Sequence, residues 1–187
     1  MNADKQGWFR LAVLATLVKR APQPPGRTAM MKFAYLLQTL RGVPLGYDFR
    51  LYNYGPYDIR VLNDLSQAER FRAVKEKTVS YPKGDGYQYL PKERCEWVCA
   101  QAADELDEFG EAIDWLVERF ASEPAWRLEL FSTIVYAERE LRRKQQPRSR
   151  NELCRRVQSI KPYFDGEKIA AAVDALARDG LIEAPAD

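Results

Sequence analysis

The chain contains no histidine among its 187 residues. Histidine is the usual general base near neutral pH, and it completes Ser/His and Cys/His dyads and many zinc sites. Its absence excludes those sites and leaves carboxylate pairs or lysine as the remaining routes to catalysis. We therefore expect a protein that is not an enzyme, with no catalytic residues, no metal site and no cofactor.

Cysteine is also scarce, with three residues and no CxxC pair. An odd number of thiols without a pairing pattern fits a reducing compartment, and we expect a cytoplasmic protein. Cys95 and Cys99 share one helix face, but Cys154 is the only further thiol in the sequence. Buried structural cysteines are therefore a better interpretation than a metal pair.

Long hydrophobic runs are missing as well. The longest, Leu11 to Val18, is interrupted by Thr16 and followed by Lys19 and Arg20. It is too short to span a bilayer, and no small-residue cleavage site follows it as in a secretory signal. With 46% hydrophobic and 30% charged residues, the composition is that of an ordinary globular protein without a membrane partner.

The first half of the chain presents an ordered series of structural signals. It offers helix, strand, helix and hairpin patterns in that order: an apolar helix over Thr28 to Arg41, a Tyr-rich strand over Tyr47 to Tyr54, a helix opening at Gly55-Pro56, and hairpin arms over Arg72 to Tyr81 and Tyr87 to Leu90 around a Gly-rich turn. We predict a mainly α (α+β) fold with a winged-helix-like unit and a small β-hairpin over residues 1–91.

The second half reads as helical, and we assign residues 92–187 to a helical unit packed against the first. An apolar stripe runs from Val98 to Phe120, and Pro124 starts the next helix. Ser149 with Glu152 matches a capping box, and Asp165 is placed to cap the last helix. A short strand at Leu181-Ile182 would make this half the opening part of a second winged-helix-like unit.

Charge is unevenly distributed along the chain, although the net charge is only +2. Every formal charge from Glu96 to Glu118 is negative, which predicts a solvated acidic helix face or a contact surface for a basic partner. The balance reverses after Arg139. The candidate nucleic-acid contacts are Arg142, Arg143, Lys144, Arg148, Arg150, Arg155 and Arg156, with Lys83 at the hairpin tip.

Tyrosine is concentrated in the strand and hairpin region. Clustered tyrosines form protein-binding patches or stack nucleic-acid bases, and they also favour strand packing. The candidate partner-binding residues are Tyr52, Tyr54, Tyr57, Tyr87 and Tyr89.

Two segments carry a family resemblance. Lys-Phe-Ala-Tyr-Leu-Leu-Gln-Thr-Leu at Lys32 to Leu40, and the segment from Tyr52 to Leu65 with its Tyr54-Gly55-Pro56-Tyr57 turn, resemble the Panacea, or SocA-like, antitoxin domain. They are also similar to small bacterial proteins of the YwgA type. The resemblance implies a non-catalytic bacterial protein of toxin–antitoxin or phage-defence contexts that acts by binding a partner.

The sequence thus favours a non-enzymatic antitoxin-like or regulatory module that binds a protein, such as a toxin or a defence component. The alternative is a winged-helix transcriptional regulator that binds DNA through the basic block and the hairpin. A homodimer is compatible with both hypotheses.

Overall fold

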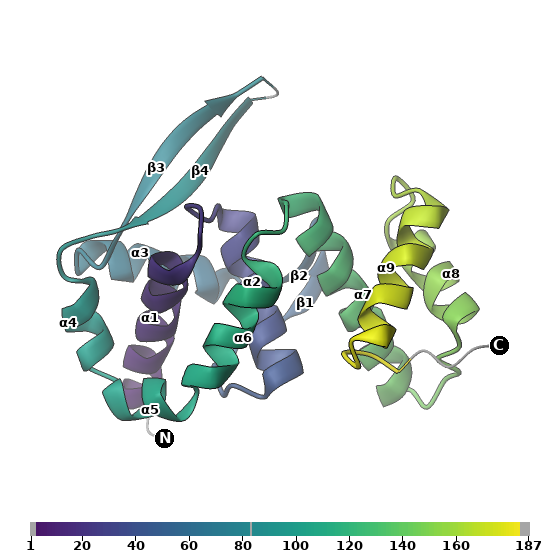
Figure 1. The fold of residues 1–187 in the computed structure, drawn as a ribbon, viewed down its shortest axis with the longest axis horizontal. Helices are drawn as coiled ribbons and strands as arrows, with labels where there is room; N and C mark the ends of the chain where they lie inside the picture. The colour runs from purple at the N-terminus through teal and green to yellow at the C-terminus, as the bar shows by residue number, and fades with distance from the viewer. Residues whose placement is uncertain (1–2, 83, 184–187) are drawn as a thin grey trace. The chain divides into compact units, whose positions relative to one another are not determined.

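The computed structural model describes residues 3–82 and 84–183. These residues are mainly helical and also form two small β-sheets of two strands each (Figure 1). This confirms the predicted α+β class. The chain divides into two compact units: the first is Met1–Arg50 with Tyr57–Ala125, and the second is Leu51–Pro56 with Trp126–Asp187. The predicted boundary at residue 91 is therefore not where the chain divides.

The first unit is built around helix α1 (Ala3–Arg20). This helix contacts each of the five helices that follow it in the chain, and its apolar residues, including Phe9 and Leu14, are fully buried. Helix α2 (Arg27–Arg41) ends at Gly42, whose φ of 68° is the left-handed conformation that glycine adopts without strain. Because later helices cover α1 as well, the unit extends well beyond the hairpin.

The segment after α2 differs from the prediction. Gly55 and Pro56 do not start a helix but lie in strand β2 (Gly55–Tyr57), which pairs with β1 (Arg50–Tyr52). Helix α3 (Ile59–Arg70) begins after Asp58, whose carboxylate accepts from the backbone N–H of Arg60 at 2.9 Å. An aspartate cap satisfies the first free amides of the helix, so the helix starts where that side chain stands.

Strands β3 (Val74–Tyr81) and β4 (Gly84–Pro91) form the predicted hairpin, with Val74 opposite Pro91. Figure 1 shows it extending away from the helices of the first unit. Strand β4 begins at Gly84, three residues before the arm predicted to start at Tyr87.

The base of the hairpin is bonded to the loop between α1 and α2. The backbone N–H of Tyr89 donates to the carbonyl of Pro25 at 2.9 Å. A Cβ added at Gly26 would lie 2.8 Å from the carbonyl oxygen of Tyr87. The loop and the ribbon therefore approach as closely as a glycine allows.

The apolar stripe of residues 98–120 is not one helix but three: α4 (Cys95–Ala100), α5 (Ala103–Glu108) and α6 (Gly110–Phe120). The first break comes at Ala102, whose φ of −141° and ψ of 44° are not helical. Short helices can turn and follow the surface of α1, which one straight helix of this length cannot do.

The second unit contains helices α7 (Ala125–Arg143), α8 (Arg150–Ile160) and α9 (Gly166–Arg178). Both predicted caps are confirmed, because Ser149 accepts from Glu152 N–H and Asp165 accepts from Glu167 N–H. Leu181 and Ile182 form no strand. As far as residue 183, the predicted second winged-helix-like unit therefore lacks its strand.

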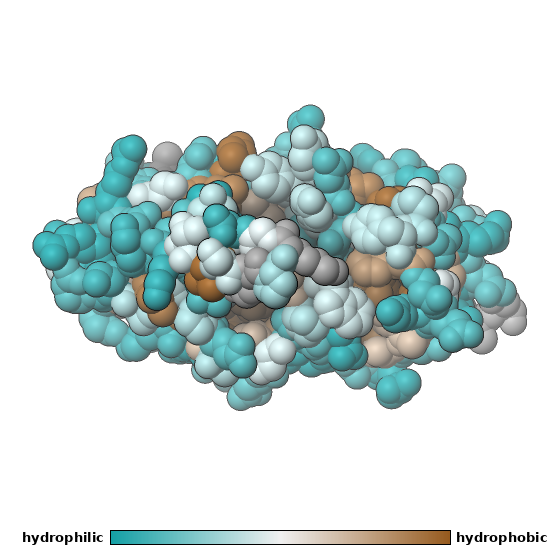
Figure 2. All heavy atoms as spheres, turned by 90° about the horizontal axis from the view of Figure 1, so that it is seen from above, coloured by the Kyte–Doolittle hydropathy of each residue, from teal (hydrophilic) through white to brown (hydrophobic). Residues whose placement is uncertain are grey.

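Figure 2 shows one face covered mainly by hydrophilic side chains with small apolar patches between them. Among the residues that the structure describes, the exposed large apolar side chains are Tyr52, Tyr54, Ile59, Tyr87, Trp97, Trp126 and Tyr163. None of the helices in residues 3–82 and 84–183 combines the length and the apolar character needed to cross a membrane.

Candidate partner-binding groove

An open groove of 730 Å³ lies within the second unit. We call it the tyrosine groove. Its lining comes from three parts of that unit: residues Leu51 to Tyr54 at the end of β1 and in the turn after it, Glu129 of α7, and residues Ile160 to Tyr163 at and just after the end of α8. The groove therefore unites segments that are far apart in the sequence.

The floor of the groove is a buried ion pair. Lys161 Nζ lies 2.7 Å from Glu129 Oε1, and the lysine residue is only 1% exposed. The same ammonium donates to the carbonyl of Asn53, which fixes the loop between β1 and β2. A buried pair with additional hydrogen bonds is a rigid arrangement, because moving either partner leaves an unpaired charge in the interior.

Tyr163 extends this network to the surface. Its hydroxyl donates to Glu129, and its ring contacts the ring of Phe164 with centroids 4.8 Å apart. Burial and the hydrogen bond to the carboxylate raise the pKa of the Tyr163 phenol, in that order of importance. The phenol therefore stays protonated and remains a donor at physiological pH.

The walls of the groove are aromatic. Tyr52, Tyr54 and Tyr163 are 64%, 67% and 62% exposed. Large amphipathic rings held at the surface by a rigid frame are typical of protein contact sites, because they bury much area with little loss of side-chain entropy.

The other predicted partner-binding tyrosines belong to the first unit and do not share one role. Tyr57 is half-buried, and Tyr87 lies under the guanidinium of Arg27, with 3.6 Å between the Arg27 Cζ and the ring centre. Tyr89 is buried, and its hydroxyl donates to Glu76 at 2.6 Å. Its prediction as a contact residue is therefore wrong: strand packing, not exposure, explains this tyrosine.

The predicted nucleic-acid block is largely a network of internal ion pairs. Arg150 makes two hydrogen bonds to Asp174, at 2.6 and 2.9 Å, and Arg156 lies 2.8 Å from Glu140. Arg148 pairs with the fully buried Glu138 and with Glu183. The remaining pairs are Arg142 with Glu183, Lys144 with Glu140, and Arg155 with Glu152. These carboxylates neutralise much of the positive charge that the sequence block suggests.

Two predicted residues of that block stand apart. Arg143 is exposed at the last turn of α7, where a cation also suits the helix dipole. Lys83, the predicted contact at the hairpin tip, lies outside the described residues.

The acidic face of the first unit is also partly paired. Glu96 contacts Lys19, Asp114 contacts Arg20, and Glu105 lies 3.7 Å from Lys5. All three cations belong to α1, so the basic partner of this acidic block is in part the protein itself.

Sequence reasoning missed Glu129, Lys161 and Tyr163. Glu129 lies in an apolar stretch of α7 where a charged residue is unexpected, and that interruption was the available signal. Its partner follows 32 positions later, beyond the end of α8, and nothing in the sequence links the two.

The chemistry available in the groove is limited. Glu129 is the only carboxylate in its lining, and it is bound to Lys161 and Tyr163. In the described part of the chain, no three acidic or thiol side chains come together as ligands for a metal ion. The groove therefore offers a shaped, hydrogen-bonding aromatic surface.

Comparison with known proteins gives no family for the chain. No protein-family model matches it, and no curated protein sequence matches it at a significant level. The resemblance to the antitoxin domain thus stays a prediction, and the function has to be argued from the geometry.

Proposed function

We propose that the protein is a non-enzymatic binding module that holds an extended segment of a protein partner in the tyrosine groove. The observation that carries the proposal is the pairing of three exposed tyrosine rings with a buried, fully hydrogen-bonded floor. A preformed site of this kind loses little entropy on binding, so ring burial is converted into affinity.

The charge of the groove favours a protein over a nucleic acid. A nucleic-acid strand needs free cations for its phosphates. The lysine in the groove is buried and bound to Glu129, and most of the arginine block is paired within the second unit. A peptide segment needs only apolar contact and a few hydrogen bonds, which the tyrosine rings and hydroxyls provide.

The class of partner follows from the resemblance of the segments Lys32 to Leu40 and Tyr52 to Leu65. An antitoxin-like protein would bind a toxin or a defence component in the bacterial cytoplasm. None of the three cysteines, all within the described residues, forms a disulfide, which is compatible with that compartment. A DNA-binding regulator is the competing prediction, and the internal pairing of its arginines disfavours it.

The test uses the full-length protein as bait in a lysate of its own bacterium, followed by affinity measurement with the purified partner. We expect Tyr54→Ala to weaken binding at least thirtyfold, which corresponds to about 2 kcal/mol for a central interface tyrosine. Tyr54→Phe should keep most of the affinity. Ile59→Ala is the matched control, since Ile59 is an exposed apolar residue of the first unit.

Two results would contradict the proposal. One is a partner whose affinity is unchanged by Tyr54→Ala and by Tyr52→Ala while both variants keep the wild-type melting temperature. The other is a self-association, measured by sedimentation, that depends on the groove and accounts for all binding.

A further inference from the structure

An aromatic cluster lies at the surface of the first unit, beside the base of the hairpin. It consists of Trp8 of α1, Phe71 after α3 and Trp97 of α4. The centroids of these rings lie between 5.1 and 6.1 Å apart in pairs. Trp8 and Phe71 are half-buried, whereas Trp97 is 41% exposed. An exposed tryptophan thus rests on two packed rings, in a different unit from the tyrosine groove.

Two segments rich in basic residues meet beside this cluster. The backbone N–H of Arg94 donates to the carbonyl of Arg72 at 3.1 Å, and that of Lys92 donates to the carbonyl of Ala73 at 2.9 Å. These bonds extend the pairing of β3 with β4 beyond the ends of the two strands. Arg70, at the end of α3, is exposed next to this extension. Cations from both ends of the hairpin therefore lie in one region of the surface.

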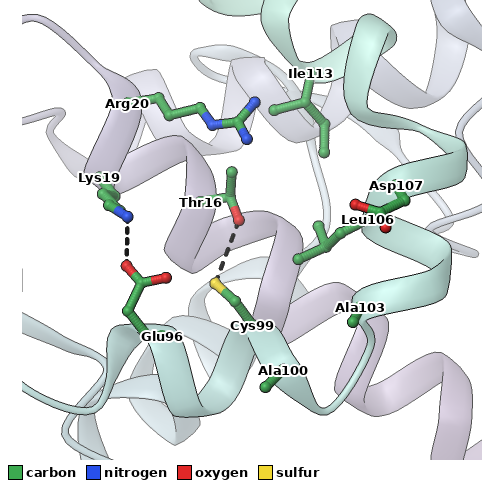
Figure 3. A pocket seen from close by; sticks show the side chains of 10 residues that line it. All are labelled: Thr16, Lys19, Arg20, Glu96, Cys99, Ala100, Ala103, Leu106, Asp107 and Ile113. Atoms are coloured by element: carbon green, nitrogen blue, oxygen red, sulfur yellow. Dashed lines mark hydrogen bonds and ion pairs between the residues drawn. The ribbon is translucent and has the colours of Figure 1, made fainter.

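The nearest carboxylates do not neutralise this region. Glu93 lies 2.6 Å from Arg72, and Figure 3 shows Glu96 of α4 bonded to Lys19 of α1. Within the described residues, three exposed cations of this region form no ion pair: Arg70, Lys92 and Arg94. The surface around the cluster therefore keeps an excess of positive charge.

Arg94 also forms a stacking platform with the exposed tryptophan. Its Cζ atom lies 4.1 Å from the centre of the Trp97 ring, which is a close cation–π contact. A guanidinium that lies over an aromatic ring has a second, outer face. Nucleic-acid bases stack on arginine planes as well as on aromatic side chains, so this outer face suits an unpaired base.

We infer that this surface, which we call the Trp97 patch, binds a single-stranded nucleic acid. The patch consists of the three rings and the three unpaired cations. A base stacks on the outer face of Arg94, and the neighbouring phosphates contact Arg70 and Lys92. The bases of a single strand are open to such stacking, whereas those of a duplex are covered by their neighbours. The carboxylates of an acidic protein segment would use the cations alone, so the platform favours a nucleic acid.

The patch differs from the basic block predicted from the sequence in the second unit. The arginines of that block are largely bound by carboxylates, as Arg150 is by Asp174. The cations of the Trp97 patch are fewer, but no carboxylate in the described part of the chain pairs with them. They escape notice in the sequence because the whole hairpin separates Arg70 from Lys92 and Arg94.

The experiment measures binding of the full-length protein to a fluorescein-labelled oligothymidylate by fluorescence anisotropy. We expect saturable binding at about 50 mM salt, and a slope of about −2 in a plot of log affinity against log salt concentration, as for about three phosphate contacts. A blunt duplex of the same length should bind at least about tenfold more weakly, because its bases cannot reach the platform.

Variants of exposed residues separate the charges from the platform. Arg70→Gln/Lys92→Gln should weaken binding at least about tenfold and reduce the slope to about −0.7, since about one phosphate contact remains. Arg94→Lys keeps the charge but removes the plane, and it should weaken binding about fivefold with little change in slope. Arg143→Gln, which removes an exposed arginine of the second unit, is the matched control and should bind like the wild type.

Three results would overturn the inference. One is the absence of saturable binding at low salt. Another is an unchanged affinity in both Arg70→Gln/Lys92→Gln and Arg94→Lys when these variants keep the wild-type melting temperature. The third is displacement of the labelled strand by polyglutamate as efficiently as by unlabelled oligothymidylate, which would instead indicate an acidic protein as the partner. None of these variants changes the tyrosine groove, so their outcome is separate from that of the proposed function.

Discussion

In the first unit the Asp64 carboxylate accepts from Arg10 at 2.7 Å and from Tyr47 at 2.8 Å, whereas in the second unit Glu129 accepts from Lys161 and Tyr163. Both acids are buried and each has one cation and one phenol. The cations differ, because the side chain of Arg10 is 20% exposed and that of Lys161 only 2%. The first pair thus keeps one partner in contact with water, and the second does not.

The difference in solvent exposure predicts how much stability each unit loses when the cation or the acid of its ion pair is replaced. A buried charge that loses a buried partner has no solvent to replace it, and this is far more costly than the loss of a half-solvated contact. The tyrosine groove depends on the more sensitive of the two pairs.

The largest effect should come from Lys161→Met, which leaves Glu129 buried without its cation. We expect the free energy of unfolding of the second unit to fall by about 3–5 kcal/mol. Urea unfolding followed by Trp126 fluorescence would measure it, since this is the only tryptophan of that unit. Adding Glu129→Gln should recover part of the loss, and no recovery would show that the lysine acts through packing alone.

A smaller effect is expected for Asp64→Asn in the first unit. The change removes the charge that Arg10 and Tyr47 share, but the guanidinium can turn toward water. We expect a loss of about 1–3 kcal/mol in the same urea assay, followed through Trp8. Tyr47→Phe is the matched control and should cost less, because it deletes only one donor. A loss of stability as large as that of Lys161→Met would contradict the proposed difference between the two ion pairs.

Acid sensitivity gives a third comparison. Hydrogen bonds from Arg27 lower the pKa of Glu76 in the hairpin, and those from Arg156 and then Lys144 lower the pKa of Glu140 in α7. A carboxylate with a lowered pKa in the folded state adds stability above its unfolded value of about 4.3 and loses it as the pH falls through the folded value.

Glu76→Gln and Glu140→Gln should therefore each flatten the decline in stability below about pH 4.5, each in its own unit. Because Arg27 and Arg156 are well exposed, the contribution should stay below about 1 kcal/mol. Melting temperatures between pH 3 and 7 would measure it. An unchanged acid response in both variants would contradict the assigned pairs.

The smallest effect should come from the triple variant Arg142→Ala/Arg143→Ala/Arg155→Ala. Exposed ion pairs contribute little, so stability should change by less than about 1 kcal/mol. If the wild type is no DNA-binding regulator, duplex affinity should show almost no salt dependence. A slope of about −5 in a plot of log affinity against log salt concentration, lost in the triple variant, would instead favour the DNA-binding regulator.

The local features of this fold could be predicted well from the sequence. The caps at Ser149 and Asp165, the stop at Gly42 and the hairpin follow from short-range side-chain and backbone chemistry, which a sequence shows directly. The same reasoning failed at Gly55-Pro56, because a glycine and proline can turn a chain between strands as readily as they can start a helix.

Features that depend on distant residues could not be predicted. The apolar stripe of residues 98–120 fits one long helix as well as three short ones, and only the surface of α1 decides between them. The groove needed the meeting of Asn53, Glu129 and Lys161, which lie on three separate segments. The clustering of tyrosines in the sequence indicated Tyr52 and Tyr54 as candidates, but nothing in it indicated the buried Glu129–Lys161 pair of the same groove.

The close approach at Gly26 has an evolutionary consequence. A side chain there would meet the carbonyl of Tyr87, so a mutation to any larger amino acid must displace either the ribbon or the loop. Descendants of this chain that retain the ribbon in this pose are therefore expected to retain glycine at that single place, whatever else drifts around it.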